Sequence, residues 1–322
     1  MIAKRRQIPL IVFEIDAILR RLDLFHPKRA ALLEDRRIYM AGYNGEKQID
    51  YHLESYNKGN SHFFADLRLI IENCPFQMDN LIVTINFLII IETKNIAGTL
   101  TFEKDSSQMI RELNGNIQGF KNPIIQVAKQ KRRLIAWLKK NKFPSIPIID
   151  LVGIADRRTI IKTTPDNRQI FEKLIHADML EEKINQLEAR YATPQLNTRQ
   201  INKLNQLLLK EHTPAPPSIL KKHGILESEL TKGNQCINCE HYPLIRISKK
   251  WYCRNCKSYS KTAHIKGVHD YFLIISTTIT NKLCREFLLV ESPTVAKRIL
   301  WSLKLKTSGS NKNRIYHRPQ NL

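Results

Sequence analysis

Long apolar runs are missing from this chain, and glycine and proline are sparse. No segment reaches the roughly 18 consecutive apolar residues that a helix needs to cross a bilayer. Glycine and proline supply 11 and 14 of the 322 residues, whereas 42% of the residues are hydrophobic. The composition therefore predicts a soluble globular protein of two or three domains, rather than a disordered or membrane-spanning one.

Acidic residues are scarce as well. The chain has 30 Asp and Glu against 52 Lys and Arg, which gives a formal net charge of +22 and a pI near 9.8. Such an imbalance predicts a polyanionic partner, with nucleic acid first and an anionic membrane second. Residues 201–322 hold 21 Lys and Arg and 7 Asp and Glu, so +14 of the +22 lies in that part of the chain. We expect a basic targeting region there.

Cysteine is used in a way that indicates a metal site. Of the six cysteines, four form two Cys-x-x-Cys pairs separated by thirteen residues, namely Cys236, Cys239, Cys253 and Cys256. Two such turns complete a tetrahedral four-sulfur zinc site. A closed four-thiolate site leaves no open coordination position, so we expect a structural zinc ribbon in preference to redox or catalytic use.

The N-terminus shows a weak signal-peptide pattern. Lys4-Arg5-Arg6 precedes the apolar residues 8–13, but Glu14 and Asp16 interrupt the apolar stretch too early for a secretory signal. Together with unpaired or metal-binding cysteines, this predicts a reducing, cytoplasmic location.

The stretch from Phe76 to Gly98 carries the clearest catalytic pattern. Two β-branched and aromatic runs flank a turn near Asn86, which predicts a buried hairpin. Because side chains alternate with period two, the hairpin brings Asp79 and Glu92 to the same end, with Lys94 beside them. Buried carboxylates cost on the order of several kcal/mol each unless they pair or hold a metal.

Two alternatives explain this cluster. Carboxylate oxygens suit Mg²⁺, which polarises a phosphate and lowers the pKa of a bound water, while Lys94 orients the attacking water or offsets charge on the phosphate. The other explanation is a structural ion pair at a strand end, because an isolated Glu-x-Lys recurs by chance.

Further motifs resemble the NERD (nuclease-related) domain of the PD-(D/E)xK nuclease superfamily. They are Gly45-Glu46-Lys47 opening a helix, Phe76-Gln77-Met78-Asp79, Ile91-Glu92-Thr93-Lys94-Asn95 with Gly98, and Asn122-Pro123-x-x-Gln126. The resemblance implies an α/β, restriction-endonuclease-like mixed sheet flanked by helices. It also implies a catalytic and Mg²⁺ (or Mn²⁺) cluster of Glu46, Asp79, Glu92 and Lys94, with Gln126 facing it from a following helix. Thr93 replaces a more usual apolar residue and by parity faces away from the site. Without the resemblance, Glu46 is equally well explained as a first-turn acid favoured by the helix dipole.

The resemblance, the proline cluster at 214–217 and the cysteine pairs indicate the domain boundaries. We expect N-terminal helices over 1–40, the nuclease-like domain over 41–162, a helical connection over 163–212, a linker over 213–233, the zinc ribbon over 234–260 and a short helical, helix-turn-helix-like region over 261–322. Within these, separate helices are predicted over 28–40 and 46–56, an exposed helix and loop over 106–119, and a helix over 168–190. A turn is predicted at Lys58-Gly59-Asn60.

Three basic segments are candidate nucleic-acid contacts. They are Lys129, Arg132 and Arg133 on the helix that begins at Asn122-Pro123, Lys249, Lys250 and Arg254 beside Trp251 in the ribbon, and Lys297 and Arg298 on the last helix. Each has a plainer alternative: a solvated helix face, a ribbon that docks protein, and an inert helical bundle.

The sequence thus predicts a metal-dependent nuclease that hydrolyses phosphodiester bonds, in DNA in preference to RNA, with no membrane partner. One alternative is a non-catalytic nucleic-acid-binding or regulatory protein with a nuclease-like fold. Another is an adaptor that binds proteins through its ribbon, for which DNA affinity would be weak and would collapse with salt.

Overall fold

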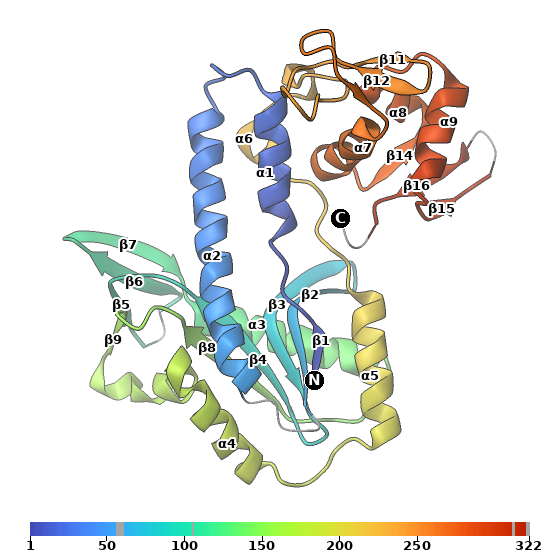
Figure 1. Cartoon of the computed structure of the whole chain (residues 1–322). Coiled ribbons are helices and arrows are strands. Elements are labelled where there is room, and N and C mark those ends of the chain that lie inside the picture. The colour runs from blue at the N-terminus through green and yellow to red at the C-terminus, as the bar shows by residue number, and fades with distance from the viewer. Residues whose placement is uncertain (56–60, 105, 311–312, 320–322) are drawn as a thin grey trace. The chain divides into compact units, whose positions relative to one another are not determined.

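The computed structural model describes residues 1–55, 61–104, 106–310 and 313–319. Tyr56 and the turn expected at Lys58-Gly59-Asn60 lie outside these residues. The chain divides into two compact units (Figure 1). Unit 1 comprises Met1–Gln7 and Ala41–Thr213, and unit 2 comprises Ile8–Met40 and Pro214–Leu322. In the described residues no helix is both long enough and apolar enough to span a membrane.

A six-stranded mixed sheet forms the centre of unit 1. Its order is β1 (Ile2–Lys4), β2 (His62–Ile71), β3 (Cys74–Val83), β4 (Leu88–Lys94), β8 (Ile148–Ile154) and β10 (Leu174–His176). The β3–β4 hairpin is antiparallel and pairs Asn80 with Ile91, whereas β8 runs parallel to β4 and pairs Val152 with Glu92. The hairpin predicted around Asn86 is therefore present.

Helices cover both faces of this sheet, as period-two alternation requires. One face packs Ile82, Ile89 and Ile91 against Ile49 and Leu53 of α2 (Arg29–Ser55), with α4 (Leu180–Arg190) on the same side. The other face packs its strand residues against α3 (Pro123–Lys140) and α5 (Thr198–Glu211). The central strands β4 and β8 are buried on both faces, and unit 1 is the nuclease-like α/β architecture that the sequence predicts.

A second sheet of unit 1 corrects one expectation. It runs β7 (Asn116–Lys121), β6 (Gln108–Leu113), β5 (Thr99–Phe102) and β9 (Ile160–Thr163). The helix and loop predicted over 106–119 are wrong, since β6 and β7 form a hairpin there. Asn114 and Gly115 at its turn have φ of 51° and 77°, the left-handed conformation that an Asn-Gly pair adopts readily.

Two predicted helices also need correction. The helices expected over 28–40 and 46–56 are one continuous helix, α2, because the packing of Ile49 and Leu53 outweighs the modest helix penalty of Gly42 and Gly45. The helix expected over 168–190 is divided: residues 165–172 form a 3-10 helix, β10 follows, residues 177–179 form another 3-10 turn, and α4 begins at Leu180. The apolar Leu174-Ile175 pair adds an edge strand beside β8 instead of a helical turn.

Unit 2 combines helices with short strands. Its elements are α1 (Leu10–Arg21), α6 (Ile219–His223), a 3-10 turn (Glu227–Glu229), β11 (Ile245–Ile247), β12 (Lys250–Tyr252), β13 (Tyr259–Ser260), α7 (Ala263–Ile274), β14 (Thr278–Thr280), α8 (Asn281–Leu288), α9 (Pro293–Ser302), β15 (Thr307–Ser308) and β16 (Ile315–His317). Strands β11, β12 and β13 form one sheet, and β14, β16 and β15 form another. Arg21 and Asp270, both fully buried, pair at 2.8 Å and join α1 to α7.

Candidate active site and metal centre

Glu92 lies near the end of β4 and is only 2% exposed. Three donors hold its carboxylate: Lys94 Nζ and Gln126 Nε2 each lie 2.6 Å from Oε1, and Gln130 Nε2 lies 2.7 Å from Oε2. Lys94 Nζ also donates to Gln126 Oε1 at 3.2 Å. The structure thus brings together the predicted Glu92, Lys94 and Gln126, because strand parity turns both β4 residues toward α3.

Asp79 lies beside this group on β3. Asn80 pairs with Ile91 in the antiparallel ladder. Asp79, one residue before Asn80, therefore lies opposite Glu92 on the neighbouring strand. The backbone N–H of Thr93 donates to Asp79 Oδ2 at 2.9 Å. Burial, and then the negative charges of Glu92 and Glu46, raise the pKa of Asp79 well above its ordinary value. The three acids therefore share one electrostatic site that has an excess of negative charge.

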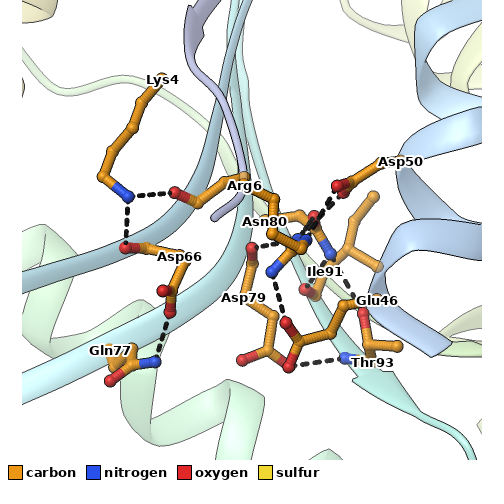
Figure 2. Close-up of polar contacts among 11 residues, drawn as sticks. Lys4, Arg6, Glu46, Asp50, Asp66, Gln77, Asp79, Asn80, Ile91 and Thr93 are labelled. Atoms are coloured by element: carbon orange, nitrogen blue, oxygen red, sulfur yellow. Dashed lines mark hydrogen bonds and ion pairs between the residues drawn. The ribbon is translucent and has the colours of Figure 1, made fainter. Parts of the chain in front are cut away.

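Glu46 reaches the site from α2, where Arg6 holds it (Figure 2). The Arg6 side chain is 3% exposed, and its Nη1 donates to Glu46 Oε2 at 2.5 Å. It also donates to both oxygens of Asp50, to Asn80 Oδ1 at 2.6 Å and to the backbone oxygen of Asp79 at 2.9 Å. Burial raises the pKa of Glu46 to about 7 despite the opposing effect of Arg6. Arg6 thereby joins the end of β1 to α2 and to β3.

Three residues of this site were not predicted from the sequence, namely Arg6, Asp50 and Gln130. Gln130 follows Gln126 by four residues, the spacing that places two side chains on one helix face, so this repeat was a usable signal. Arg6 had no local signal, because its partners lie at least 40 residues away in sequence. Thr93 lies on the opposite face of β4 from Glu92, where its Oγ1 accepts from Asn80 Nδ2 at 3.1 Å.

The acidic residues offer the oxygen ligands that a hard divalent cation takes. Burial, followed by the charges of Glu92 and Glu46, raises the pKa of Asp79, and a divalent cation bound here would favour its ionised form. The carboxylate oxygens of Glu46, Asp79 and Glu92 do not all lie within 4.8 Å of one another. Among the described residues, the four cysteines form the one group of at least three His, Cys, Asp or Glu side chains that meets this limit.

The basic residues predicted on α3 lie elsewhere. Lys129, Arg132 and Arg133 line a hollow of about 320 Å³ with residues of the β2–β3 turn, such as Glu72. The α3 residues that contact Glu92 are instead Gln126 and Gln130.

The four predicted cysteines do converge in unit 2. Cys236 Sγ lies 3.6 Å from Cys256 Sγ, and Cys239 Sγ lies 3.5 Å from Cys253 Sγ. A tetrahedral zinc with Zn–S bonds of about 2.3 Å requires sulfur separations of about 3.8 Å, so the four thiols fit this ion. Burial opposes ionisation of Cys236, but hydrogen bonds from Ser258 and from backbone N–H groups lower its pKa to about 6.

The basic residues of unit 2 are exposed, as a surface contact requires. Lys249, Lys250 and Arg254 in the ribbon and Lys297 and Arg298 on α9 all face solvent. Trp251, the aromatic residue beside these cations, is 1% exposed, and its Nε1 donates to His264 Nδ1 at 3.1 Å. It packs in the core of the ribbon, so it is unavailable to stack on a base.

Comparison with known proteins gives one match. Residues 41–155 match the family model of the nuclease-related domain, NERD. This range contains Glu46, Asp79, Glu92, Lys94 and Gln126, the candidate catalytic residues. No curated protein and no solved structure gives a significant match to the chain.

Proposed function

We propose that this nuclease-related domain hydrolyses phosphodiester bonds of nucleic acid with the help of a divalent cation. The observation that carries the proposal is the buried Glu92, which holds Lys94 and Gln126 beside Asp79, whose pKa is raised by burial first and then by the charges of Glu92 and Glu46. A structural ion pair would need one carboxylate and one cation. Glu92 pairs with Lys94 and Glu46 pairs with Arg6, whereas Asp79 accepts from a backbone N–H, so Asp79 is the carboxylate that a metal ion best explains.

Each residue has a role in this proposal. Asp79 and Glu92 would hold Mg²⁺ or Mn²⁺, with Glu46 assisting. The ion would polarise the phosphate and lower the pKa of a bound water. Lys94, held by Glu92 and Gln126, would orient the attacking water and stabilise negative charge that develops on the phosphate oxygens. Gln126 and Gln130 fix the carboxylate of Glu92 in one orientation.

Unit 2 would bind the nucleic acid. Exposed Lys297 and Arg298 lie on α9, which follows α8 as in a helix-turn-helix, and the β15–β16 hairpin comes after it as a wing. This arrangement suits a DNA duplex, so we propose DNA over RNA as the target. A zinc ion in the four-cysteine site would stabilise the ribbon and take no part in the chemistry.

The test is cleavage of a panel of labelled DNA and RNA, single- and double-stranded, with Mg²⁺ or Mn²⁺ or with chelator. Wild type is compared with Glu92→Ala and Lys94→Ala, and with Lys140→Ala and Glu181→Ala, which change exposed residues outside the site. We expect metal-dependent cleavage by wild type and both controls, and its loss in the two site variants, with zinc content unchanged.

A second candidate function is non-catalytic nucleic-acid binding. Two observations favour it. Arg6 donates to the carboxylate of Glu46, and the carboxylate oxygens of the acidic cluster do not all lie within 4.8 Å of one another. Tight binding by wild type without cleavage of any substrate in the panel would contradict the nuclease proposal and support this alternative.

A further inference from the structure

A cleft of about 990 Å³ opens within unit 1 beside α2. Its walls include Lys47, Tyr51 and His52 of α2, Asn95 after β4, and Arg157 and Arg158 after β8. The floor lies at the carboxyl ends of two neighbouring parallel strands, where the Ala155 N–H donates to Lys94 O at 2.9 Å. Crevices at such strand ends are common ligand sites in α/β proteins.

The cleft and the candidate active site share the same elements. Lys47 and Tyr51 directly follow Glu46 and Asp50 on α2, and Asn95 directly follows Lys94. The helix presents Glu46 and Asp50 toward Arg6, while Lys47 and Tyr51, one position further round, line the cleft. A chain lying in the cleft therefore runs on the α2 side of β4, next to Glu46, whereas Glu92 and Lys94 face α3 on the other side of the sheet.

The cations of the cleft can turn toward a ligand. Arg157 is 80% exposed and pairs with Asp178 at 3.4 Å, and Arg158 is 87% exposed and pairs with Asp156 at 3.0 Å. Such solvent-exposed ion pairs contribute little to the free energy of folding, so the phosphate groups of a ligand can replace these carboxylates as partners of the two arginines. Lys47, Arg157 and Arg158 outnumber Asp156, the acid among the lining residues, and the lining carries a net positive charge.

Tyr51 gives the cleft an aromatic surface. It is 74% exposed, and its ring meets His52 edge to face, with centroids 5.5 Å apart and planes at 80°. The aromatic residues of a protein core stack or pack against apolar neighbours, but Tyr51 stands in a polar, cationic setting. Cationic grooves with exposed aromatic rings bind single strands, because an unpaired base can stack on the ring.

We propose that this cleft binds a single-stranded segment of nucleic acid, with a base stacked on Tyr51 and adjacent phosphates held by Lys47, Arg157 and Arg158. The inference rests on the proposed function in that the cleft adjoins the cluster to which we assign hydrolysis. In a duplex, each base face is already stacked on its neighbours, so only a single-stranded end, flap or gap fits Tyr51.

A metal-free crosslinking experiment tests this independently of cleavage. Full-length protein is irradiated with DNA or RNA oligonucleotides that carry 5-bromouracil, in single-stranded and blunt duplex form, and adducts are located by mass spectrometry. We expect an adduct at Tyr51 with single-stranded DNA, single-stranded RNA or both. An excess of unlabelled single strand should prevent its formation, and an excess of duplex should not. Adducts confined to residues 214–322, or equal displacement by duplex, would overturn the proposal.

Variants of the cleft provide the second readout. Tyr51→Phe keeps the ring and should keep the crosslink. The second measurement is protection of Lys47 from chemical acetylation by bound single strand. In Tyr51→Ala, the single-strand concentration that gives half-maximal protection should rise about tenfold. Equal protection of Lys47 in wild type and Tyr51→Ala would contradict the stacking role. Because Tyr51 is exposed, thermal unfolding should be unchanged in both variants. Crosslinking at Tyr51 without cleavage of any substrate would leave the binding site supported and the nuclease proposal wrong.

Discussion

Arg6 and Asp50 form a two-point ion pair, with Nε 2.8 Å from Oδ2 and Nη2 2.9 Å from Oδ1. The pair joins the chain after β1 to the C-terminal half of α2 and leaves Nη1 for Glu46. Because a guanidinium has five N–H donors in a rigid fork, one side chain can hold both acids and two further oxygens at once. The position of Glu46 beside Asp79 therefore depends on Arg6.

Removal of Arg6 should destabilise unit 1. In Arg6→Ala, Glu46 and Asp50 lose their buried cation, and we expect a loss of about 3–5 kcal/mol in the free energy of unfolding, measured by urea denaturation. Arg6→Lys should recover part of it, since an ammonium keeps the charge and loses the fork. The control is Arg37→Ala, whose partner Glu34 is exposed, and it should leave the urea midpoint almost unchanged. A small effect of Arg6→Ala would contradict its structural role.

Two glycines of α2 should respond in opposite ways to alanine. A Cβ at Gly42 meets nothing within 4 Å, so Gly42→Ala should stabilise the helix by about 0.5–1 kcal/mol. A Cβ at Gly45 would lie 2.2 Å from Asn95 Cβ, so Gly45→Ala should force α2 away from β4 and lower stability. Thermal unfolding of the two variants checks this. Equal effects would show that helix propensity outweighs the close approach.

Gln130 should act as a positioning residue for the proposed reaction. Gln130→Leu removes one of three donors to Glu92, and we expect cleavage to fall about 10–100-fold and the Mg²⁺ concentration for half-maximal cleavage to rise. KM for nucleic acid should change little, because Gln130 is buried and does not line the cleft. The matched control is Gln186→Leu on α4, which has an exposed partner, Glu182. Loss through KM alone would contradict the positioning role.

Zinc should be needed for the ribbon and dispensable for unit 1. Purified protein should contain one zinc per chain, and Cys253→Ser should contain none. Since structural zinc contributes on the order of 10 kcal/mol in small modules, metal loss should unfold the ribbon strands. The control is Cys74→Ser, an exposed cysteine outside the cluster, which should retain zinc. Elemental analysis and calorimetry provide the measurements. Full zinc content in Cys253→Ser would rule out the four-cysteine site.

Glu14 should make the stability of unit 2 depend on pH. Its Oε1 accepts from Ser218 N and Ile219 N. Burial raises the pKa of Glu14 from 4.5 to about 7, although these two hydrogen bonds and then Arg318 oppose the shift. Between these values the folded state keeps a proton that the unfolded state has lost, so stability falls as pH rises through this window, by at most about 3 kcal/mol. Glu14→Gln keeps the acceptor and cannot ionise. Denaturation at pH 4.5 and pH 8 should therefore show a smaller difference in the variant.

Features that arise within short segments can be predicted from the order of the residues alone. A tight turn and period-two alternation place Asp79, Glu92 and Lys94 together without long-range information. The two Cys-x-x-Cys turns likewise predict the four-cysteine site from local spacing. Asn122 caps α3 through a bond from Ile124 N at 3.0 Å, as an Asn-Pro start predicts, and this sets Gln126 toward the sheet.

Tertiary structure decided what depends on distant partners. Arg6 becomes a site residue only when β1 pairs with β2 and brings it to α2, since charge pairing across 40 residues leaves no local pattern. The same holds for α2 itself, which runs through Gly42 because core packing outweighs propensity. The cleft beside Tyr51 likewise exists only where α2 crosses the ends of β4 and β8. Local rules are short-range, whereas burial and charge pairing act between whichever segments the fold brings together.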